Sequence, residues 1–158
     1  MNLFYSTHIQ GDTHLLDEAE SKHAIRVLRL LKGEKLILVD GTGGWYEALI
    51  EDEHPKRCLL RIMNSKTNYQ AMGYSLHLAV SPTKNLDRFE WFLEKATEIG
   101  ISEITPLICH RSERKQVKME RLERILVSAM KQSLKAYKPV LNEALRFEDF
   151  MKLEHVGT

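Results

Sequence analysis

The alternation of strand-like and helix-like segments in the second half of the chain constrains its fold most strongly. Residues 75–80 and 104–109 are short, nearly continuous apolar runs, which are typical of strands buried on both faces of a sheet. Between them, residues 86–99 place apolar side chains at helical spacing, and Gly100 stands where helices commonly end. A second helix is predicted over residues 119–135. This order of strands and helices predicts a parallel α/β sheet.

The first half has a different period and predicts mostly strands. One helix is expected over residues 17–28, with Asp17 as its N-cap. The segment Asp40-Gly41-Thr42-Gly43-Gly44 favours a hairpin turn, because glycine adopts positive φ without steric cost. Backbone N–H groups there could instead hold a phosphate, but the segment lies between two predicted strands rather than before a helix. Short strands joined by such turns predict a small β-barrel. The expected strands are residues 3–6, 34–39, 45–50 and 58–63.

A stretch of low hydrophobicity at residues 64–73 separates the two patterns, so we expect domains at residues 1–70 and 74–158. With 43% hydrophobic residues, the chain can bury a core. It contains no run approaching 18 apolar residues and no signal-peptide pattern, so we expect a cytoplasmic protein with no membrane contact. Cys58 and Cys109 are expected to be free thiols in a reducing compartment.

Positive charge is concentrated in residues 110–138, although the whole chain has a net charge of only +1. This segment holds nine Lys or Arg residues against three Glu, a local net charge of +6. One interpretation is a phosphate-binding face. The other is a solvated helix surface with ion pairs such as Glu120–Arg124. The charge pattern leaves both open.

The common catalytic and metal-binding motifs are absent from the sequence, including the Walker loop, the dinucleotide-binding glycine motif and paired C-x-x-C. Cys109-His110 offers too few ligands for a metal, so we expect no metal site and interpret the pair as structural. His23 is interpreted as a polar helix-face residue, and Trp91 as a core or subunit-interface residue. The residues alone therefore leave the catalytic groups unknown.

Short motifs along the whole chain resemble the 16S ribosomal RNA (uracil-N3)-methyltransferases of the SPOUT class. Each motif is weak alone, but their order and spacing together are specific. In the first half they are His23-Ala-Ile-Arg26-Val-Leu-Arg29, Gly33, and Asp40-Gly41 followed by Tyr46-Glu-Ala-Leu-Ile50. In the second half they are Lys84 with Arg88-Phe-Glu, Glu94-Lys95-Ala-Thr-Glu98-Ile-Gly100, Ile104-Thr-Pro106-Leu, Arg111-Ser112 with Lys118, and Ala129, Gln132-Ser133 and Pro139.

The resemblance implies a two-domain chain of mixed α+β and α/β class. A small PUA-like RNA-binding β-barrel would be followed by the N-terminal part of a SPOUT methyltransferase domain. It also implies methylation of uracil N3 in 16S ribosomal RNA with S-adenosylmethionine, by a homodimer that acts on this RNA or on the small ribosomal subunit. A non-catalytic RNA-binding module is the alternative. The RNA-facing positions that the resemblance implies are Arg26, Arg29, Lys84, Arg88, Lys95, Arg111 and Lys118, with Gln132 and Lys135 bordering the active site.

The chain departs from the family pattern in three ways. Lys131 and Lys135 stand where the family usually has an acid and an arginine, and lysine lacks the bidentate fork of arginine. The loop from Lys84 to Arg88 is one residue longer than in some members. The glycine-rich segments that form the family's trefoil knot are not found up to Thr158. We therefore expect this chain to have no cofactor-binding residues, to bind no S-adenosylmethionine and to be inactive alone.

Overall fold

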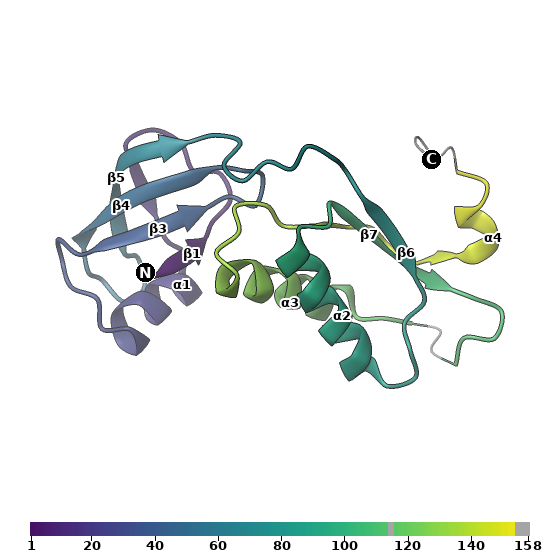
Figure 1. The fold of residues 1–158 in the computed structure, drawn as a ribbon. Coiled ribbons are helices and arrows are strands. Elements are labelled where there is room, and N and C mark those ends of the chain that lie inside the picture. The colour runs from purple at the N-terminus through teal and green to yellow at the C-terminus, as the bar shows by residue number, and fades with distance from the viewer. Residues whose placement is uncertain (114–115, 154–158) are drawn as a thin grey trace. The chain divides into compact units, whose positions relative to one another are not determined.

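The computed structural model describes residues 1–113 and 116–153, which form two compact units (Figure 1). Unit 1 contains Met1–Ala71 together with Met130–Tyr137. Unit 2 contains the described residues of 72–129 and 138–153. Sequence patterns did not predict that residues 130–137 associate with unit 1. No helix among the described residues is both long and apolar enough to cross a membrane.

Unit 1 is a curled five-stranded sheet (Figure 1). The strands occur in the order β1-β3-β4-β5-β2, and only the pair of β1 and β3 is parallel. Because β1 and β2 are the two edges of this order, the expected barrel is an open half-barrel. The strands are β1 (Leu3–Tyr5), β2 (Thr13–Leu15), β3 (Lys35–Val39), β4 (Trp45–Asp52) and β5 (Leu59–Lys66).

The predicted helix of the first half is confirmed, but it changes type midway. It begins as α1 (Glu18–Lys22), where the Asp17 carboxylate accepts a hydrogen bond of 2.7 Å from the Glu20 amide. It continues as the π-helix η1 (His23–Val27). Short π-helical segments are rare and occur frequently at functional sites. The end of this helix is therefore a candidate binding surface.

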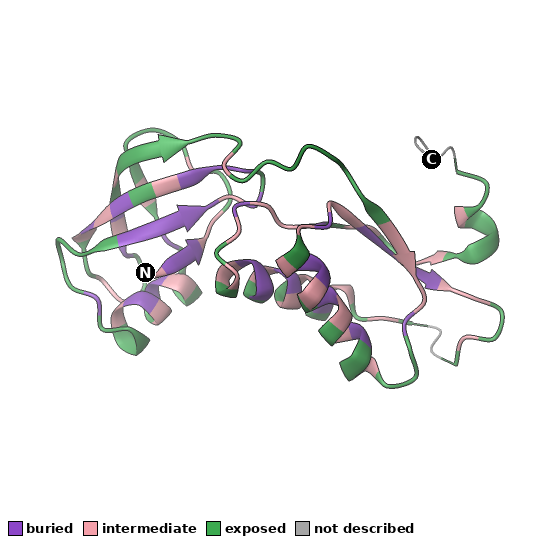
Figure 2. Ribbon diagram, in the orientation of Figure 1, coloured by how far each residue is buried: buried purple, intermediate pink, exposed green. Residues whose placement is uncertain are grey.

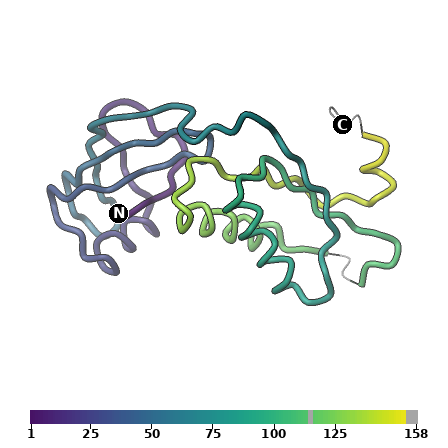
Figure 3. The backbone as a smooth tube through the Cα atoms, viewed as in Figure 1, coloured from purple at the N-terminus to yellow at the C-terminus, as the bar shows by residue number. Residues whose placement is uncertain are grey.

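The strand β3 is buried on both faces (Figure 2). Leu36 and Leu38 join one apolar cluster with Phe4 and Leu60, as the alternating pattern of a strand requires. Ile37 and Val39 point the other way. Their cluster includes Met130 and Ala136 from the distant segment of unit 1. Residues 130–137 therefore complete the hydrophobic core of unit 1, and Figure 3 traces their backbone as it leaves the long helix in yellow-green.

Unit 2 is a parallel sheet with helices, as the alternating pattern predicted. The strand β7 pairs in parallel with β6 and β8, and separately with β9. The interior of β7 is buried, whereas β6 is only half-buried because it has one pairing neighbour in this sheet. The expectation that residues 75–80 are buried on both faces is therefore wrong. The elements are β6 (His77–Val80), α2 (Leu86–Ile99), β7 (Glu103–Ile108), α3 (Met119–Gln132), β8 (Val140–Leu141), β9 (Leu145–Arg146) and α4 (Phe147–Phe150).

The ends of α2 follow the local sequence signals. The Asn85 side chain caps the first turn by accepting a hydrogen bond of 2.9 Å from the Asp87 amide. Gly100 ends the helix with φ of 98°, the left-handed conformation that glycine adopts at low cost. The last three residues of α3, from Met130, belong to unit 1, so this helix supplies residues to both units.

Candidate nucleic-acid interface

The end of η1 and the loop that follows it display cationic and apolar side chains together. Arg26 and Arg29 are exposed and have no carboxylate partner among the described residues. Val27 and Leu31 are 67% and 62% exposed, which is high for large aliphatic side chains. Guanidinium groups can contact phosphates, and exposed apolar groups can pack on unstacked bases. The end of η1 and this loop together therefore carry side chains for both kinds of contact that single-stranded nucleic acid offers.

The backbone of this loop is held in place despite its exposure. The Leu30 side chain is buried, and its amide donates a hydrogen bond of 3.0 Å to the carbonyl oxygen of Ala24. The Leu31 amide donates to a carboxylate oxygen of Glu34 at 2.6 Å. Arg29 adopts φ of 55°, a left-handed conformation that costs energy for a residue with a side chain. Such conformations persist where the surroundings enforce them, and they cluster at functional sites.

The glycine-rich segment after β3 is a hairpin turn, as predicted, and its backbone N–H groups are already occupied. A carboxylate oxygen of Asp40 accepts hydrogen bonds from the amides of Thr42 at 2.8 Å and Gly44 at 2.9 Å. Burial alone raises the pKa of Asp40, but these hydrogen bonds and one from Tyr46 outweigh it, so the pKa is lowered overall. The aspartate fills the position that a phosphate would need, which rules against the phosphate-cradle interpretation.

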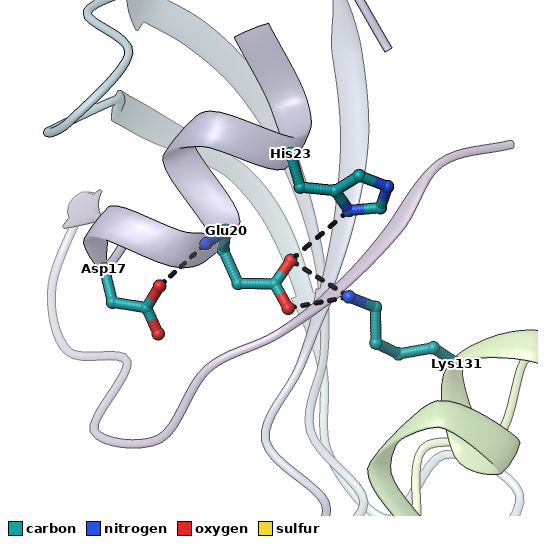
Figure 4. A network of polar contacts seen from close by, with 4 residues as sticks. All are labelled: Asp17, Glu20, His23 and Lys131. Carbon is teal, nitrogen blue, oxygen red and sulfur yellow. Dashed lines mark hydrogen bonds and ion pairs between the residues drawn. The ribbon is translucent and has the colours of Figure 1, made fainter. Parts of the chain in front are cut away.

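The segment at the end of α3 carries Gln132 and Lys135, the two residues expected to border the active site. Gln132 is exposed and Lys135 is half-buried. Their neighbour Lys131 instead forms an ion pair with Glu20, with its Nζ atom 2.6 Å from Oε1 (Figure 4). The His23 ring lies beside the same carboxylate, with Nδ1 3.9 Å from Oε2. Nothing in the local sequence identified this pair, because its partners are 111 residues apart.

In unit 2, polar side chains gather where β6 and β7 end. The hydroxyls of Ser81 and Ser112 are 2.9 Å apart, and Ser112 also accepts a hydrogen bond of 2.9 Å from the Cys109 amide. These contacts connect the loops after the two parallel strands. Ligands of parallel α/β sheets bind outside the carboxyl ends of the strands. Arg111 belongs to one of these loops, is exposed, and has no carboxylate partner among the described residues.

The remaining expected RNA-facing residues of unit 2 differ in how their charges are balanced. Arg88 on α2 and Lys118 before α3 are exposed, with no carboxylate partner in the described part of the chain. Lys84 forms an ion pair with Glu113 at 3.0 Å, and Lys95 contacts both carboxylate oxygens of Glu98 at 2.9 Å. The two lysines would have to share or release these partners in order to bind a phosphate.

The basic segment of residues 110–138 combines both interpretations that the sequence left open. Three of its cations are balanced by glutamates: Arg121 by Glu90, Lys131 by Glu20, and Lys138 by Glu123. Four others have no carboxylate partner among the described residues, and they are Arg111, Lys118, Arg124 and Lys135. The Glu120–Arg124 pair, the example given for a solvated helix surface, is not formed. Arg114 and Lys115 lie outside the described residues. The positive potential is therefore weaker than the sequence count suggests.

The structure tests one further interpretation, the placement of Trp91. Trp91 is 61% exposed on α2, so its assignment to the core is wrong, although a place at a subunit interface stays a prediction. Among the described residues, no group of three or more His, Cys, Asp or Glu side chains is arranged to hold a metal ion.

Comparison with known proteins decides the family. Residues 71–156, more than half of the chain, match the RNA methyltransferase domain. The chain belongs to the RNA methyltransferase family. Residues 16–63 match the PUA domain of RNA methyltransferases, in agreement with the half-barrel of unit 1.

Relatives within this family carry the name ribosomal RNA small subunit methyltransferase E. The Synechocystis protein is 32% identical over 143 residues, which are 89% of this chain and 46% of the relative. The Aquifex aeolicus protein is 28% identical over 156 residues, 96% of this chain and 66% of the relative. The chain thus spans between about half and two thirds of the length of these relatives.

Solved structures show the same fold. A probable rRNA-methyltransferase from Porphyromonas gingivalis superposes with a TM-score of 0.88 at 37% identity, covering 98% of this chain and 65% of that one. A putative methyltransferase from Legionella pneumophila, in complex with the bound cofactor S-adenosylmethionine, superposes with a TM-score of 0.83 at 25% identity. That superposition covers 98% of this chain and 67% of the other.

Proposed function

We propose that this chain provides RNA-contacting surfaces of an enzyme that methylates uracil N3 in 16S ribosomal RNA with S-adenosylmethionine. The observation that carries the proposal is the end of η1 with the fixed loop after it, where Arg26 and Arg29 have no carboxylate partner among the described residues. The names of its relatives supply the substrate class. The partner is the 16S ribosomal RNA or the small ribosomal subunit, and the enzyme acts as a cytoplasmic homodimer.

The chemistry explains why such a surface is needed. Uracil N3 lies on the Watson–Crick edge, so the base must be unpaired before a methyl group can reach it. N3 must also lose its proton before it attacks the methyl group in line. Much of the acceleration in such a reaction comes from holding the reactants in that geometry. The role of this chain's cations is to bind the phosphates that flank the base and to orient the RNA, and the general base is not assigned.

The individual residues contribute unequally to this proposal. Arg26, Arg29 and Arg111 are the strongest candidates for phosphate contacts, because they are exposed and not balanced by a described carboxylate. Arg88 and Lys118 share these properties. Lys84 and Lys95 are weaker candidates because of their glutamate partners. Gln132 and Lys135 are proposed to border the site where the base is held.

No methyl-donor site is proposed among the described residues. The pocket beside the carboxyl ends of β7 and β9 has a volume of about 330 Å³ and is lined by Ile108, Cys109, His110, Arg146 and Glu148. These lining residues are mixed in character, and none of them marks the pocket as a site for the methyl donor. We therefore assign no residue of this chain to S-adenosylmethionine and derive no step through it.

Methyl transfer and RNA binding should be measured together. The chain would be incubated with small ribosomal subunits and S-adenosylmethionine, and the RNA would then be reverse transcribed. A methyl group at N3 blocks Watson–Crick pairing, so a new stop at a uracil would establish the activity in this chain. RNA binding without a stop is the result expected of this chain alone, and a non-catalytic RNA-binding module would give the same result. Absence of binding would overturn both hypotheses.

A further inference from the structure

The ion pair between Lys131 and Glu20 is the most protected one in unit 1 among the described residues. The Nζ atom of Lys131 lies 2.6 Å and 3.0 Å from the two carboxylate oxygens of Glu20. The two side chains are only 19% and 17% exposed. Nζ also lies 5.5 Å from the centre of the Phe4 ring, which adds a cation–π contact. Low exposure limits screening by salt, so this pair is stronger than the surface pairs of the same unit.

The pair is one of several attachments of residues 130–137 to the half-barrel. At another, Ala136 accepts a backbone hydrogen bond of 3.0 Å from Gly43. Its own amide donates to the side-chain oxygen of Gln70 at 3.1 Å. Gln132 and Lys135 lie between these two contacts, and the Leu134 carbonyl oxygen beside them accepts a hydrogen bond of 3.2 Å from the Gln70 side chain. Their positions on unit 1 are therefore fixed from both sides.

The other partner of the pair lies on the helix that carries an RNA-facing arginine. Glu20 belongs to α1, and the helix continues from it past His23 (Figure 4). This continuation is η1, which contains Arg26. We propose that the Glu20–Lys131 pair is a positioning clasp. It fixes Gln132 and Lys135 relative to Arg26, so that all three residues contact the same RNA molecule. This inference rests on the proposed function for its ligand, but its structural part does not depend on RNA.

The clasp acts through effective concentration. When Arg26 and Lys135 are held in one arrangement, the first contact with RNA brings the second group to its phosphate at little further entropic cost. Without the clasp, residues 131–135 are held less firmly, and more of their ordering takes place when the RNA binds. Lys131 itself is a positioning residue, because Glu20 already balances its charge.

The structural part is tested on the RNA-free chain by amide hydrogen exchange at Gly43 and Ala136. Lys131→Gln should speed exchange at both amides by about tenfold, the change that loss of a partly buried ion pair of about 1.4 kcal/mol produces. The reversed pair, Glu20→Lys with Lys131→Glu, should restore most of the protection. Lys22→Gln is the matched control, because it removes an exposed pair with Glu18 on the same helix and should change neither amide. Unchanged exchange in Lys131→Gln would overturn the clasp.

The functional part measures how much RNA affinity Lys135→Ala removes, once in the wild-type chain and once in the Lys131→Gln variant. On a 16S ribosomal RNA fragment, the substitution should lower affinity about fivefold in the wild-type chain and less than about twofold beside Lys131→Gln. Equal losses in both backgrounds would show that the clasp does not couple the two contacts. If the wild-type chain binds no RNA, the proposed function fails, while the exchange measurement still decides whether the clasp exists.

Discussion

Tyr137 lies directly against Gly43, so that a Cβ atom built on the glycine would overlap the tyrosine ring and its hydroxyl. The two residues are 94 positions apart, and both belong to unit 1. Gly43 also has φ of 100°, which side-chain-bearing residues rarely adopt. Gly43 is therefore required for two reasons. The turn after β3 needs its positive φ, and the packing of residues 130–137 needs its lack of a side chain.

The first prediction compares two glycines. Gly43→Ala should destabilise the chain by about 3 kcal/mol, because left-handed strain and overpacking against Tyr137 add together. Gly11→Ala is the control: Gly11 also has positive φ, but a Cβ atom there would meet nothing within 4 Å, so about 1 kcal/mol is expected. Denaturant unfolding of the two variants measures the difference. Equal losses would mean that Tyr137 does not sit on Gly43.

A second prediction concerns pH. The pKa of Asp40 is lower in the folded chain than the value of about 3.9 expected when unfolded, so its stabilising effect is present above that value. The effect is lost as pH falls through the folded pKa. Asp40→Asn should therefore lower the free energy of unfolding by about 1 kcal/mol at pH 7. The difference in unfolding free energy between the variant and the wild type should disappear below about pH 4. Unfolding measured from pH 7 to pH 3 checks this, and a gap that widens in acid would contradict it.

The two thiols should react differently with iodoacetamide. Burial, with smaller contributions from Asp52 and Glu53, raises the pKa of the Cys58 thiol to about 11. Cys58 is fully buried, whereas Cys109 is partly exposed. Because the thiolate is the reactive form, mass spectrometry of the folded chain at pH 8 should find the label on Cys109 well before Cys58. Equal labelling rates would show that unit 1 opens readily.

A further substitution tests the conformation of Arg29. Arg29→Gly should stabilise the loop by relieving positive φ, offset by the greater flexibility of glycine when unfolded, so the net change should stay within about 1 kcal/mol. RNA affinity should nevertheless fall, because the guanidinium is gone. Thermal melting and RNA binding on the same variant separate the two effects. A large loss of stability would mean that the Arg29 side chain is needed for folding.

Local signals predicted the elements whose ends are set by neighbouring residues. Asn85 and Gly100 define α2, and the apolar run of β7 predicted a buried parallel strand, because caps and periodicity act over a few residues. The glycine-rich hairpin was also predicted. Its internal hydrogen bonds to Asp40 were not, since the same sequence fits a phosphate cradle.

The association of residues 130–137 with unit 1 could not be predicted. It depends on Lys131 meeting Glu20 and on Ala136 meeting Gly43, contacts between residues about a hundred positions apart. Helical periodicity predicts which face of α3 is apolar. It does not predict that the last turn, from Met130, belongs to unit 1 while the rest of the helix belongs to unit 2. For the same reason the charge count overstated the basic face, because partners such as Glu20 lie outside the segment that was counted.

The most direct test of the RNA-contacting role is the salt dependence of binding to a 16S ribosomal RNA fragment. The logarithm of the affinity should fall linearly with the logarithm of salt concentration, because bound cations release counterions from phosphates. Arg111→Ala should weaken binding and flatten the slope by about one unit. Lys152→Ala, which removes a lysine already balanced by Asp149 at 3.0 Å, should leave the slope unchanged. Binding that is insensitive to salt, or equal slopes for wild type and Arg111→Ala, would contradict the account.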